Sequence, residues 1–488
     1  MNRNARKWLV VTFAAVLVLA ACGQKQGVSL SANGGGGDGS GFSDDGTGSD
    51  GTGSDGTGTD GTGTGGEGGN GEASSGTGGS TGGSNGTGGS TRTRTRTGTG
   101  GGTPIAGAPD RTGIDDVNKV IKIGVHAPVT GAAPIEQKTF DKGKDVYWQW
   151  LAKNGGLYGG YRVEIKFYDD KFEPVEARRR CAQLVEQDKV FLLIGAAGAD
   201  QITACANYAN SKNVPYLSAG VNTEGLDGLR TYFAVSETYA EQMPKLAQMV
   251  KAKIGVKKLG LAVLDSKSFA DARAAARKAF TAAGFQIVAD KNVGKETNPQ
   301  SGKSIAGDLQ DAGAEIVLAL VSPTIFLYIA NGAQSEAYFP EYVGPGVTNG
   351  LNTVATAGCP AIGKAKFFSP FPQLDAIDSM DPAYRPAYNE FITNKDGSQR
   401  PDDIGIALWG LNKSLHQMFK AIPDVKQLSR QSFISTLTSG KTFSTGVYPS
   451  VTFSPTDHFG ADTVHLLEAD CQAAPAQFKT RATFAKSF

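Results

Sequence analysis

The stretch VIKIGVH at residues 120–126 sets the pattern of the folded part of the chain, because its apolar side chains alternate as in a β-strand. A helical stretch at 140–153 and a strand at 162–168 follow, and then a helix at 173–187 and the apolar run VFLLI at 190–194. Short apolar strands that alternate with amphipathic helices indicate parallel sheets covered by helices on both faces. The sequence therefore predicts an α/β domain with mostly parallel sheets.

The alternation continues to residue 343 and divides into two series. The first ends with a helix at 200–210 and a strand at 214–217, and the second has helices at 238–253, 269–282, 302–311 and 323–333 and strands at 258–264, 285–290, 315–321 and 341–343. Two such series suggest two lobes rather than one large sheet. Ligand sites in open parallel sheets lie beyond the carboxyl ends of the strands, so the candidate loops are those after residues 126, 194, 217, 264, 321 and 343.

The composition separates a folded part from a low-complexity part. The 488 residues include 48 basic and 47 acidic side chains, and this balance excludes the broad basic surface of a nucleic-acid-binding protein. Glycine fills 32 of the 78 positions in residues 27–104, beside Ser, Thr and Asp. Such a composition predicts a flexible, disordered tether with an r.m.s. span of about 50 Å. We place this tether at residues 22–117.

The first 21 residues have the features of an export signal. Three basic side chains precede the apolar run at 8–21, which is too short to span a bilayer. The run leads into LAAC at 19–22, which resembles the lipobox of bacterial lipoproteins, in which the cysteine (here Cys22) carries the lipid. A plain secretory signal with an incidental Cys22 is the alternative. We expect a protein anchored through lipid to the extracytoplasmic face of the cell membrane.

Several short motifs occur in a fixed order along the folded part: IKIGV at 121–125, NGGLYG at 154–159, FYDD at 167–170, VPY at 214–216 and YVGP at 342–345. Their order and spacing resemble those of leucine/isoleucine/valine-binding proteins, and the resemblance covers residues 118–472. It implies the type I fold of the solute-binding proteins of ABC importers. In that fold two α/β lobes, each a mostly parallel sheet flanked by helices, are joined by three hinge crossings and close around a small ligand.

The resemblance also implies a division of the chain. The three hinge crossings would lie near residues 233–235, 366–369 and 451–454. Lobe 1 would then comprise residues 118–234 and 369–452, lobe 2 would comprise 235–368 and 453–472, and residues 473–488 would form a C-terminal tail.

The same resemblance places seven residues in the ligand cleft: Thr130, Ala199, Asp200, Asn222, Phe269, Ser322 and Gly346. Ala199 and Asn222 replace residues that hold the ligand carboxylate in the family, and Gly346 replaces the acid that pairs with the ligand ammonium. Phe269 matches an aromatic residue that closes over the ligand in the family. It could equally well pack in the core without contacting a ligand. Thr130 and Asn222 could equally be turn residues.

The loss of the acid at Gly346 bears on the ligand. A buried unpaired charge costs several kcal/mol, so a zwitterion would need another acid, for which Asp200 and Glu136 are the candidates. We therefore expect leucine, isoleucine and valine to bind weakly unless one of these two acids substitutes. The solute class remains broad: an amino-acid-like molecule, an amide or a related compound.

Four cysteines remain besides Cys22, and their number alone permits three pairings. The family often bridges the starts of its second and third helices, which implies Cys181–Cys205 here and leaves Cys359–Cys471. We expect no metal site, because the chain has no Cys-x-x-Cys and only four His. His126 is the one His that is a candidate for the cleft.

The leading hypothesis is a lipid-anchored solute-binding subunit that delivers a small organic solute to an ABC permease and its ATPase, without a cofactor. A sensor or cell-wall-associated binding protein with the same fold is the alternative. An enzyme is least favoured, because the Gly-x-Ser-x-Gly sequences around Ser80 and Ser84 lie in the tether and not between a strand and a helix.

Overall fold

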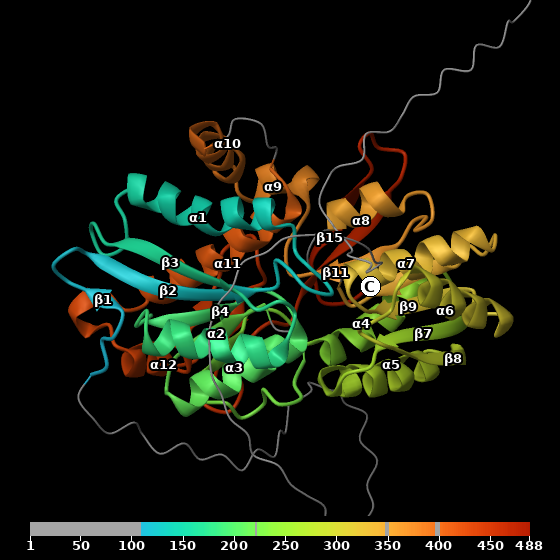
Figure 1. Cartoon of the computed structure of the whole chain (residues 1–488), viewed down its shortest axis with the longest axis horizontal. Helices are drawn as coiled ribbons and strands as arrows, with labels where there is room; N and C mark the ends of the chain where they lie inside the picture. The colour runs from blue at the N-terminus through green and yellow to red at the C-terminus, as the bar shows by residue number, and fades with distance from the viewer. Residues whose placement is uncertain (1–108, 220–221, 347–350, 396–400) are drawn as a thin grey trace, which may run out of the picture. The chain divides into compact units, whose positions relative to one another are not determined.

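The computed structural model describes residues 109–488 except 220–221, 347–350 and 396–400 (Figure 1). The expected signal segment, Cys22 and the tether up to residue 108 therefore lie outside the described residues. The tether was expected to reach residue 117, but its last nine residues belong to the folded domain. Strand β1 (Ile114–Asp115) pairs with β2 (Val120–Ala127), and Asp110 accepts a 2.8 Å hydrogen bond from the guanidinium of Arg430. The folded domain thus begins earlier than its composition suggested.

The first sheet is built around β2 and has the strand order β1-β2-β4-β5-β6, with β3 pairing to β2. All its pairs are parallel except β1 with β2. Its further strands are β2 (Val120–Ala127), β3 (Arg162–Asp169), β4 (Leu192–Gly195), β5 (Tyr216–Ser218) and β6 (Tyr232–Ala234). The carboxyl ends of β2, β3, β4, β5 and β6 consequently lie at one edge of the sheet.

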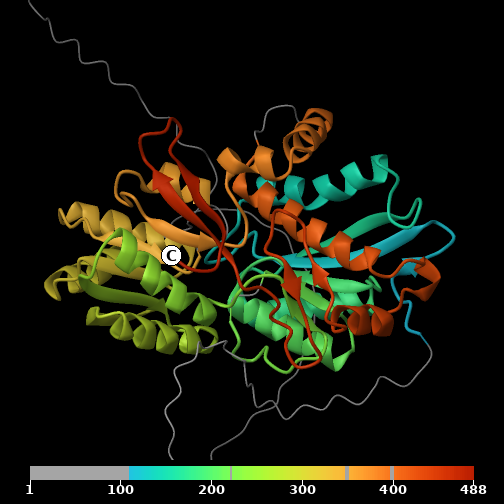
Figure 2. The ribbon, with the colours of Figure 1, turned by 180° about the vertical axis from the view of Figure 1, so that it is seen from behind.

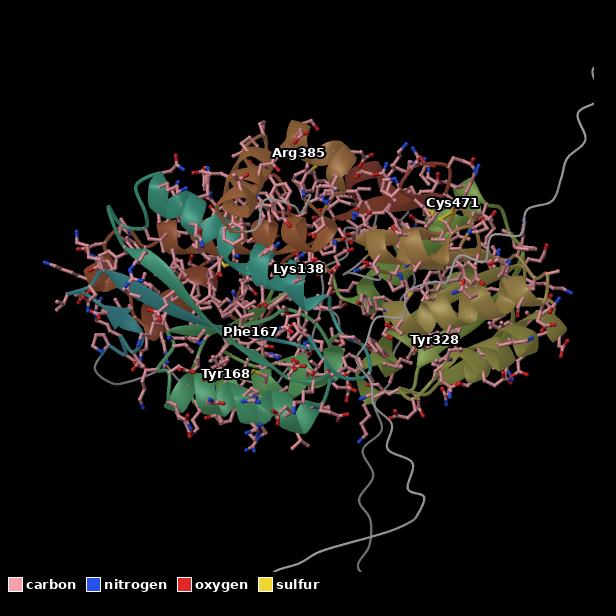
Figure 3. All side chains as sticks on the ribbon, turned by 45° about the horizontal axis from the view of Figure 1, so that its top comes forward. Lys138, Phe167, Tyr168, Tyr328, Arg385 and Cys471 are labelled. Carbon is pink, nitrogen blue, oxygen red and sulfur yellow. A yellow bond between two sulfur atoms is a disulfide. The ribbon has the colours of Figure 1, made fainter. Side chains whose placement is uncertain are left out.

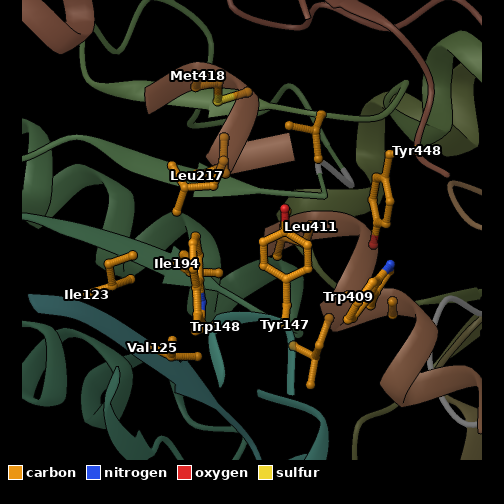
Figure 4. Close-up of a cluster of buried hydrophobic side chains, with 14 of the residues drawn as sticks. Ile123, Val125, Tyr147, Trp148, Ile194, Leu217, Trp409, Leu411, Met418 and Tyr448 are labelled. Atoms are coloured by element: carbon orange, nitrogen blue, oxygen red, sulfur yellow. The ribbon is translucent and has the colours of Figure 1, made fainter. Parts of the chain in front are cut away.

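Helices cover both faces of the first sheet because β4 is apolar on both sides. Leu192 and Ile194 face the core formed with α1 and α11, whereas Leu193 faces α2 and α3. Figure 4 shows the first of these cores, with Tyr147 and Trp409 in edge contact. The elements that complete lobe 1 are α1 (Gln137–Lys153), α2 (Pro174–Glu186), α3 (Ala199–Ser211), α9 (Leu374–Met380), α10 (Tyr384–Lys395), α11 (Asp403–Lys420), η2 (Val425–Gln427), α12 (Arg430–Leu437), β12 (Thr442–Phe443) and β13 (Val451–Thr452).

The second sheet has seven strands in the order β15-β14-β11-β10-β9-β7-β8, and the five from β11 to β8 run parallel. Its strands are β7 (Lys258–Leu264), β8 (Gln286–Val293), β9 (Ile316–Leu320), β10 (Glu341–Gly344), β11 (Lys366–Ser369), β14 (Val464–Asp470) and β15 (Gln477–Ala485). Its helical elements are α4 (Tyr239–Lys253), η1 (Lys267–Phe269), α5 (Ala270–Ala282), α6 (Pro299–Asp311), α7 (Pro323–Ser335) and α8 (Leu351–Gly358).

The expectation of a C-terminal tail is wrong for most of residues 473–488. Strand β15 adds antiparallel to β14 at the edge of the second sheet, as Figure 2 shows in red. Phe478 is buried in the core of lobe 2, and Phe488 stacks on Phe368 with ring centroids 5.3 Å apart. Alternating polar residues on an exposed edge strand give a weak strand signal, which explains why the sequence did not reveal it.

The chain passes between the two lobes after β6, after β11 and after β13, at the three places expected for hinge crossings. The first and third passages lie side by side. The backbone N–H of Ala234 donates to the carbonyl of His458 at 2.9 Å, and Phe233 stacks on the imidazole of His458. These contacts tie the two passages together at the end of β6.

Each lobe contains one disulfide, and both have the expected pairing. Cys181 on α2 is joined to Cys205 on α3, with a Cα–Cα distance of 5.8 Å. Cys359 after α8 is joined to Cys471 after β14, with a Cα–Cα distance of 5.4 Å, and Cys471 is labelled in Figure 3. The first disulfide links neighbouring helices, and the second fastens the antiparallel edge of lobe 2 to the end of α8.

Helices α6 and α7 pack closely through glycine. A Cβ added to Gly332 would lie 2.5 Å from the Cα of Lys303, so the two backbones leave no room for a side chain. Gly307, also on α6, has no atom within 4 Å of such a Cβ.

We therefore predict opposite effects for two identical substitutions. Gly332→Ala should lower the free energy of unfolding by about 1–3 kcal/mol, because a backbone atom of Lys303 would have to move. Gly307→Ala should raise it by about 0.5–1 kcal/mol through helix propensity. Urea unfolding followed by circular dichroism measures both, and a destabilised Gly307→Ala variant would contradict the packing described.

Candidate functional site

A cavity of about 430 Å³ lies between the two lobes at the carboxyl ends of their strands. Lobe 1 contributes the segments that follow β2, β4 and β5, and lobe 2 contributes those that follow β7, β9 and β10. These are the six loops that the strand pattern singled out. The sheet topology therefore brings together segments that lie more than 200 residues apart in the sequence.

Five of the seven predicted site residues line this cavity: Ala199, Asp200, Phe269, Ser322 and Gly346. The other two do not. Thr130 is exposed and its hydroxyl donates to Asp169, at the turn that follows β2. Asn222 is fully buried and its amide donates to the carbonyl of Glu224 at 2.7 Å. Both residues thus stabilise turns, which is the alternative that the sequence left open for them.

The walls of the cavity are mainly apolar. Many of the lining side chains were not predicted: Val129, Ile135, Phe172, Ile202, Tyr239, Leu264, Leu320, Val321, Leu327, Val354 and Ile404. Tyr239 and Phe269 stack with ring centroids 5.9 Å apart, so Phe269 takes part in packing and also faces the cavity. The sequence predicts that the loops after the strands line the cavity. Ile404 and Val354, however, lie on helices, and the strand pattern does not predict where those helices pack.

The N-terminus of α3 opens on the cavity. Residues Gly195–Gln201 line it, and Gly198 adopts a positive φ of 83° that favours glycine. The N-cap position of this helix is occupied by Gly198, which has no side chain that could cap it. Uncapped backbone N–H groups at a helix start are hydrogen-bond donors, so this end of the cavity suits an oxygen acceptor.

Asp200 reaches across to lobe 2. Its carboxylate accepts a hydrogen bond from the hydroxyl of Ser266 and forms an ion pair with Lys295. Burial would raise the pKa of Asp200, but the hydrogen bonds from Lys295 and Ser266 and the charge of Lys295 outweigh it and lower the pKa below its usual value. The carboxylate therefore stays ionised and paired at neutral pH, and it links the two lobes.

Three further carboxylates bridge the lobes, and one of them, Asp375 on α9, accepts from the hydroxyl and the backbone N–H of Thr480 on β15. Asp271 at the start of α5 accepts hydrogen bonds from the hydroxyl of Thr223 and from its backbone N–H, the latter at 3.1 Å. Asp403 on α11 accepts from the backbone N–H groups of Leu351 and Asn352, which start α8. A carboxylate from lobe 1 thus occupies the positive end of a helix in lobe 2. In each bridge the acceptor charge belongs to one lobe and the donors belong to the other.

The lobe 1 side of the cavity is acidic. Glu136, the N-cap residue of α1, is exposed and lines the cavity. Burial, together with the charges of Asp403 and Glu136, raises the pKa of Asp402 to about 7, and burial raises that of Asp403 to about 6. Among the described residues no Lys, Arg or His side chain lines the cavity.

His126, the predicted cleft candidate, lies in the core of lobe 1 and does not line the cavity. Its ring nitrogens contact a carboxylate oxygen of Asp170 at 2.7 Å and the hydroxyl of Tyr216 at 2.6 Å. Cys181 and Cys205 lie close to it, but their sulfur atoms form a disulfide and offer no thiolate to a metal. This group is therefore structural.

Two lobes with parallel sheets, three passages of chain and a cavity between the carboxyl ends define a protein that encloses a small ligand. The sequence matches the periplasmic binding protein family over residues 120–475, and the chain belongs to that family. Its members are ligand-binding components of transport systems and not enzymes, and they act outside the cytoplasm. In the part of the chain that the structure describes, no helix has the length and apolar character needed to cross a membrane.

Individual relatives have low sequence identity to this chain. A Leu/Ile/Val-binding protein homolog of Brucella abortus is 28% identical over 224 residues, which are 44% of this chain and 56% of that protein. The match thus spans little more than half of the relative's length. A homolog from Brucella suis is 27% identical over the same length.

Three solved structures share the fold at low sequence identity. The fatty acid ABC transporter substrate-binding protein of Thermomonospora curvata has a TM-score of 0.64 and 18% identity, covering 79% of this chain and 97% of its own. A branched chain amino acid ABC transporter protein of Thermus thermophilus with bound valine has a TM-score of 0.62 and 16% sequence identity. The match covers 75% of this chain and 97% of that protein. A solute-binding protein of Rhodopseudomonas palustris BisB5 in complex with 3,4-dihydroxy benzoic acid also has a TM-score of 0.62 and 16% sequence identity. That match covers 76% of this chain and 98% of that protein.

The raised pKa of Asp402 gives a testable pH dependence. Asp402 caps α11 by accepting from the N–H of Gly405 at 2.7 Å, and Asn can make the same contact without a charge. Since the folded-state pKa is raised, wild-type stability associated with this group is present at low pH and is lost as the pH rises toward 7. The gain in stability of Asp402→Asn over wild type should therefore be larger at pH 8 than at pH 5, by at least about 1 kcal/mol.

Chemical denaturation at the two pH values measures this difference. The comparison of each variant with wild type at the same pH removes the contribution of all other groups. A stability difference that is equal at pH 5 and pH 8 would contradict the assignment.

Proposed function

We propose that this protein is the solute-binding subunit of an ABC importer, and that it binds a small organic solute between its lobes and delivers it to a permease. The observation that carries the proposal is the cavity formed by the carboxyl ends of both sheets. Contacts from a ligand to both lobes would stabilise the closed arrangement, which the permease could then recognise. Family membership supports transport, and the neighbours named above bind valine, a fatty acid or an aromatic acid.

The solute that suits this cavity is uncharged, with an apolar body and one hydrogen-bonding end. Asp200 is already paired with Lys295, and Gly346 has no side chain to meet an ammonium group. No basic side chain among the described residues lines the cavity to meet a carboxylate. The backbone N–H donors at the start of α3 suit a carbonyl oxygen, as in an amide. A charged ligand would leave a charge without a partner, at a cost of several kcal/mol.

A set of four ligands with one carbon skeleton separates these cases. We expect 4-methylpentanamide to bind at least about tenfold more tightly than leucine, 4-methylpentanoate or 4-methylpentylamine, a difference of about 1.4 kcal/mol. The four compounds share the branched alkyl body and differ in the charges they carry. Isothermal titration calorimetry at pH 7 gives the four affinities directly.

The acids near the cavity provide the control. Asp200→Asn together with Glu136→Gln removes both carboxylates that could meet an ammonium group. Tight leucine binding that survives this double substitution would show that the ligand site lies elsewhere. Leucine binding abolished by Glu136→Gln alone would instead assign the ammonium to Glu136 and reject an uncharged solute.

We propose further that the protein is held at the extracytoplasmic face of the cell membrane by lipid on Cys22. The motif LAAC at 19–22 follows a basic segment and an apolar run, as in an export signal, and glycine-rich sequence separates it from the folded domain. A tether with a span of about 50 Å would let the binding domain leave the membrane surface and return to a permease.

Cys22→Ser tests the anchor. The substitution should move the protein from the membrane fraction to the medium or leave its signal segment uncleaved, because no thiol remains to be lipidated. Fractionation and the mass of the mature protein report these outcomes. Unchanged membrane retention with normal cleavage would reject lipidation at Cys22.

A sensor or wall-associated binding protein with the same fold is the second candidate. The long glycine-rich connection favours it, since a binding domain that works away from the membrane needs such reach. Solute uptake by cells that lack this protein distinguishes the two: loss of uptake supports transport, and normal uptake supports sensing.

A further inference from the structure

A second, smaller cavity of about 30 Å³ adjoins the main one inside lobe 1. Four residues line both cavities: Ile135, Ala196, Ala219 and Ile404. Two of the four are alanines, so only small side chains separate the two cavities at these positions. The side cavity therefore borders the main cavity on the side that faces the interior of lobe 1, and these four side chains lie between the two spaces.

The far wall of the side cavity is formed by core residues. Ala407, Leu408 and Leu411 on α11 line it, together with Phe371 on the passage that follows β11. All four are buried, with at most 7% of their surface exposed. Leu411 and the neighbouring Tyr448 are labelled in Figure 4, where they lie in the aromatic core of lobe 1.

The size and the lining of this space favour an apolar occupant. About 10–15 Å³ is enough for one water, so the volume would hold about two. The side chains that surround it are almost all hydrocarbon and offer few hydrogen bonds, and apolar cavities of this kind stay dry. A short hydrocarbon group would fill it at no cost in lost hydrogen bonds and would gain dispersion contacts with the walls.

We propose that the side cavity is a subsite for the apolar end of the solute, and that it receives one or two carbon atoms of an alkyl or aryl group. This inference rests on the proposed function, because it takes the main cavity as the ligand site. The polar end of the solute stays in the main cavity at the start of α3, and the hydrocarbon end passes between Ala196 and Ala219. The subsite selects solutes by the length of their apolar part.

The subsite can be tested with two neutral ligands that differ by two carbons, 4-methylpentanamide and 2-methylpropanamide. Each buried methylene contributes about a fourfold gain in affinity, so the longer amide should bind wild type about fifteenfold more tightly. Ala407→Leu places a larger side chain in the side cavity, and Ala407 itself does not line the main cavity. It should remove most of this fifteenfold difference and leave the affinity for the shorter amide within about twofold.

Ala387→Leu on α10 is the matched control, because Ala387 is buried in the same core and lines neither cavity. It should leave the fifteenfold difference intact. Since a larger side chain in a packed core can prevent folding, Leu411→Ala provides a second variant that enlarges the side cavity. It should preserve the affinity for the shorter amide and strengthen binding of an amide longer than 4-methylpentanamide.

The outcomes separate this inference from the proposed function. A chain-length difference that Ala407→Leu and Leu411→Ala leave unchanged would overturn the subsite while the main cavity keeps its role. Equal weakening of both amides by Ala407→Leu, with the control unaffected, would also overturn it. If neither amide binds wild type in calorimetry, the proposed solute class is wrong and the subsite falls with it.

Discussion

Parallel strands end at one edge of their sheet, and the ligand cavity exists because the chain sets two such edges against each other. The passages after β6, β11 and β13 fix this arrangement, and the contacts of Ala234 and Phe233 with His458 hold the first and third together. Every segment that lines the cavity owes its position to this constraint. The loops after β4 and β9 meet although more than 120 residues separate them.

The charged groups near the cavity serve the contact between the lobes. Asp200, Asp271 and Asp403 each accept hydrogen bonds across the boundary, and Lys295 completes one of these bridges. A carboxylate whose hydrogen bonds come from the opposite lobe is satisfied only while the lobes are together. These bridges therefore favour the closed arrangement before a ligand adds its own contacts.

Much of the fold could be predicted from the sequence, because short apolar strands such as VFLLI at 190–194 have few alternative structures. The order of the family motifs was enough to place five of the predicted residues at the wall of the cavity. The rest depended on tertiary contacts. Thr130 and Asn222 match the family in position, but the acceptors near them, Asp169 and the carbonyl of Glu224, hold them in turns. Strand β15 pairs only on one side, and Ile404 reaches the cavity from a helix that no strand pattern places.

Selectivity and closure are linked through Asp200. A ligand ammonium would have to share this carboxylate with Lys295, and a ligand carboxylate would have to share Lys295 with Asp200. In either case the charges at the bridge would no longer balance, and an unbalanced charge that is partly buried is costly. An uncharged solute leaves the bridge intact, so its contacts add to those that already hold the lobes together. In the proposed function, the ion pair would act against charged ligands without affecting a neutral one, and the apolar walls would supply the affinity.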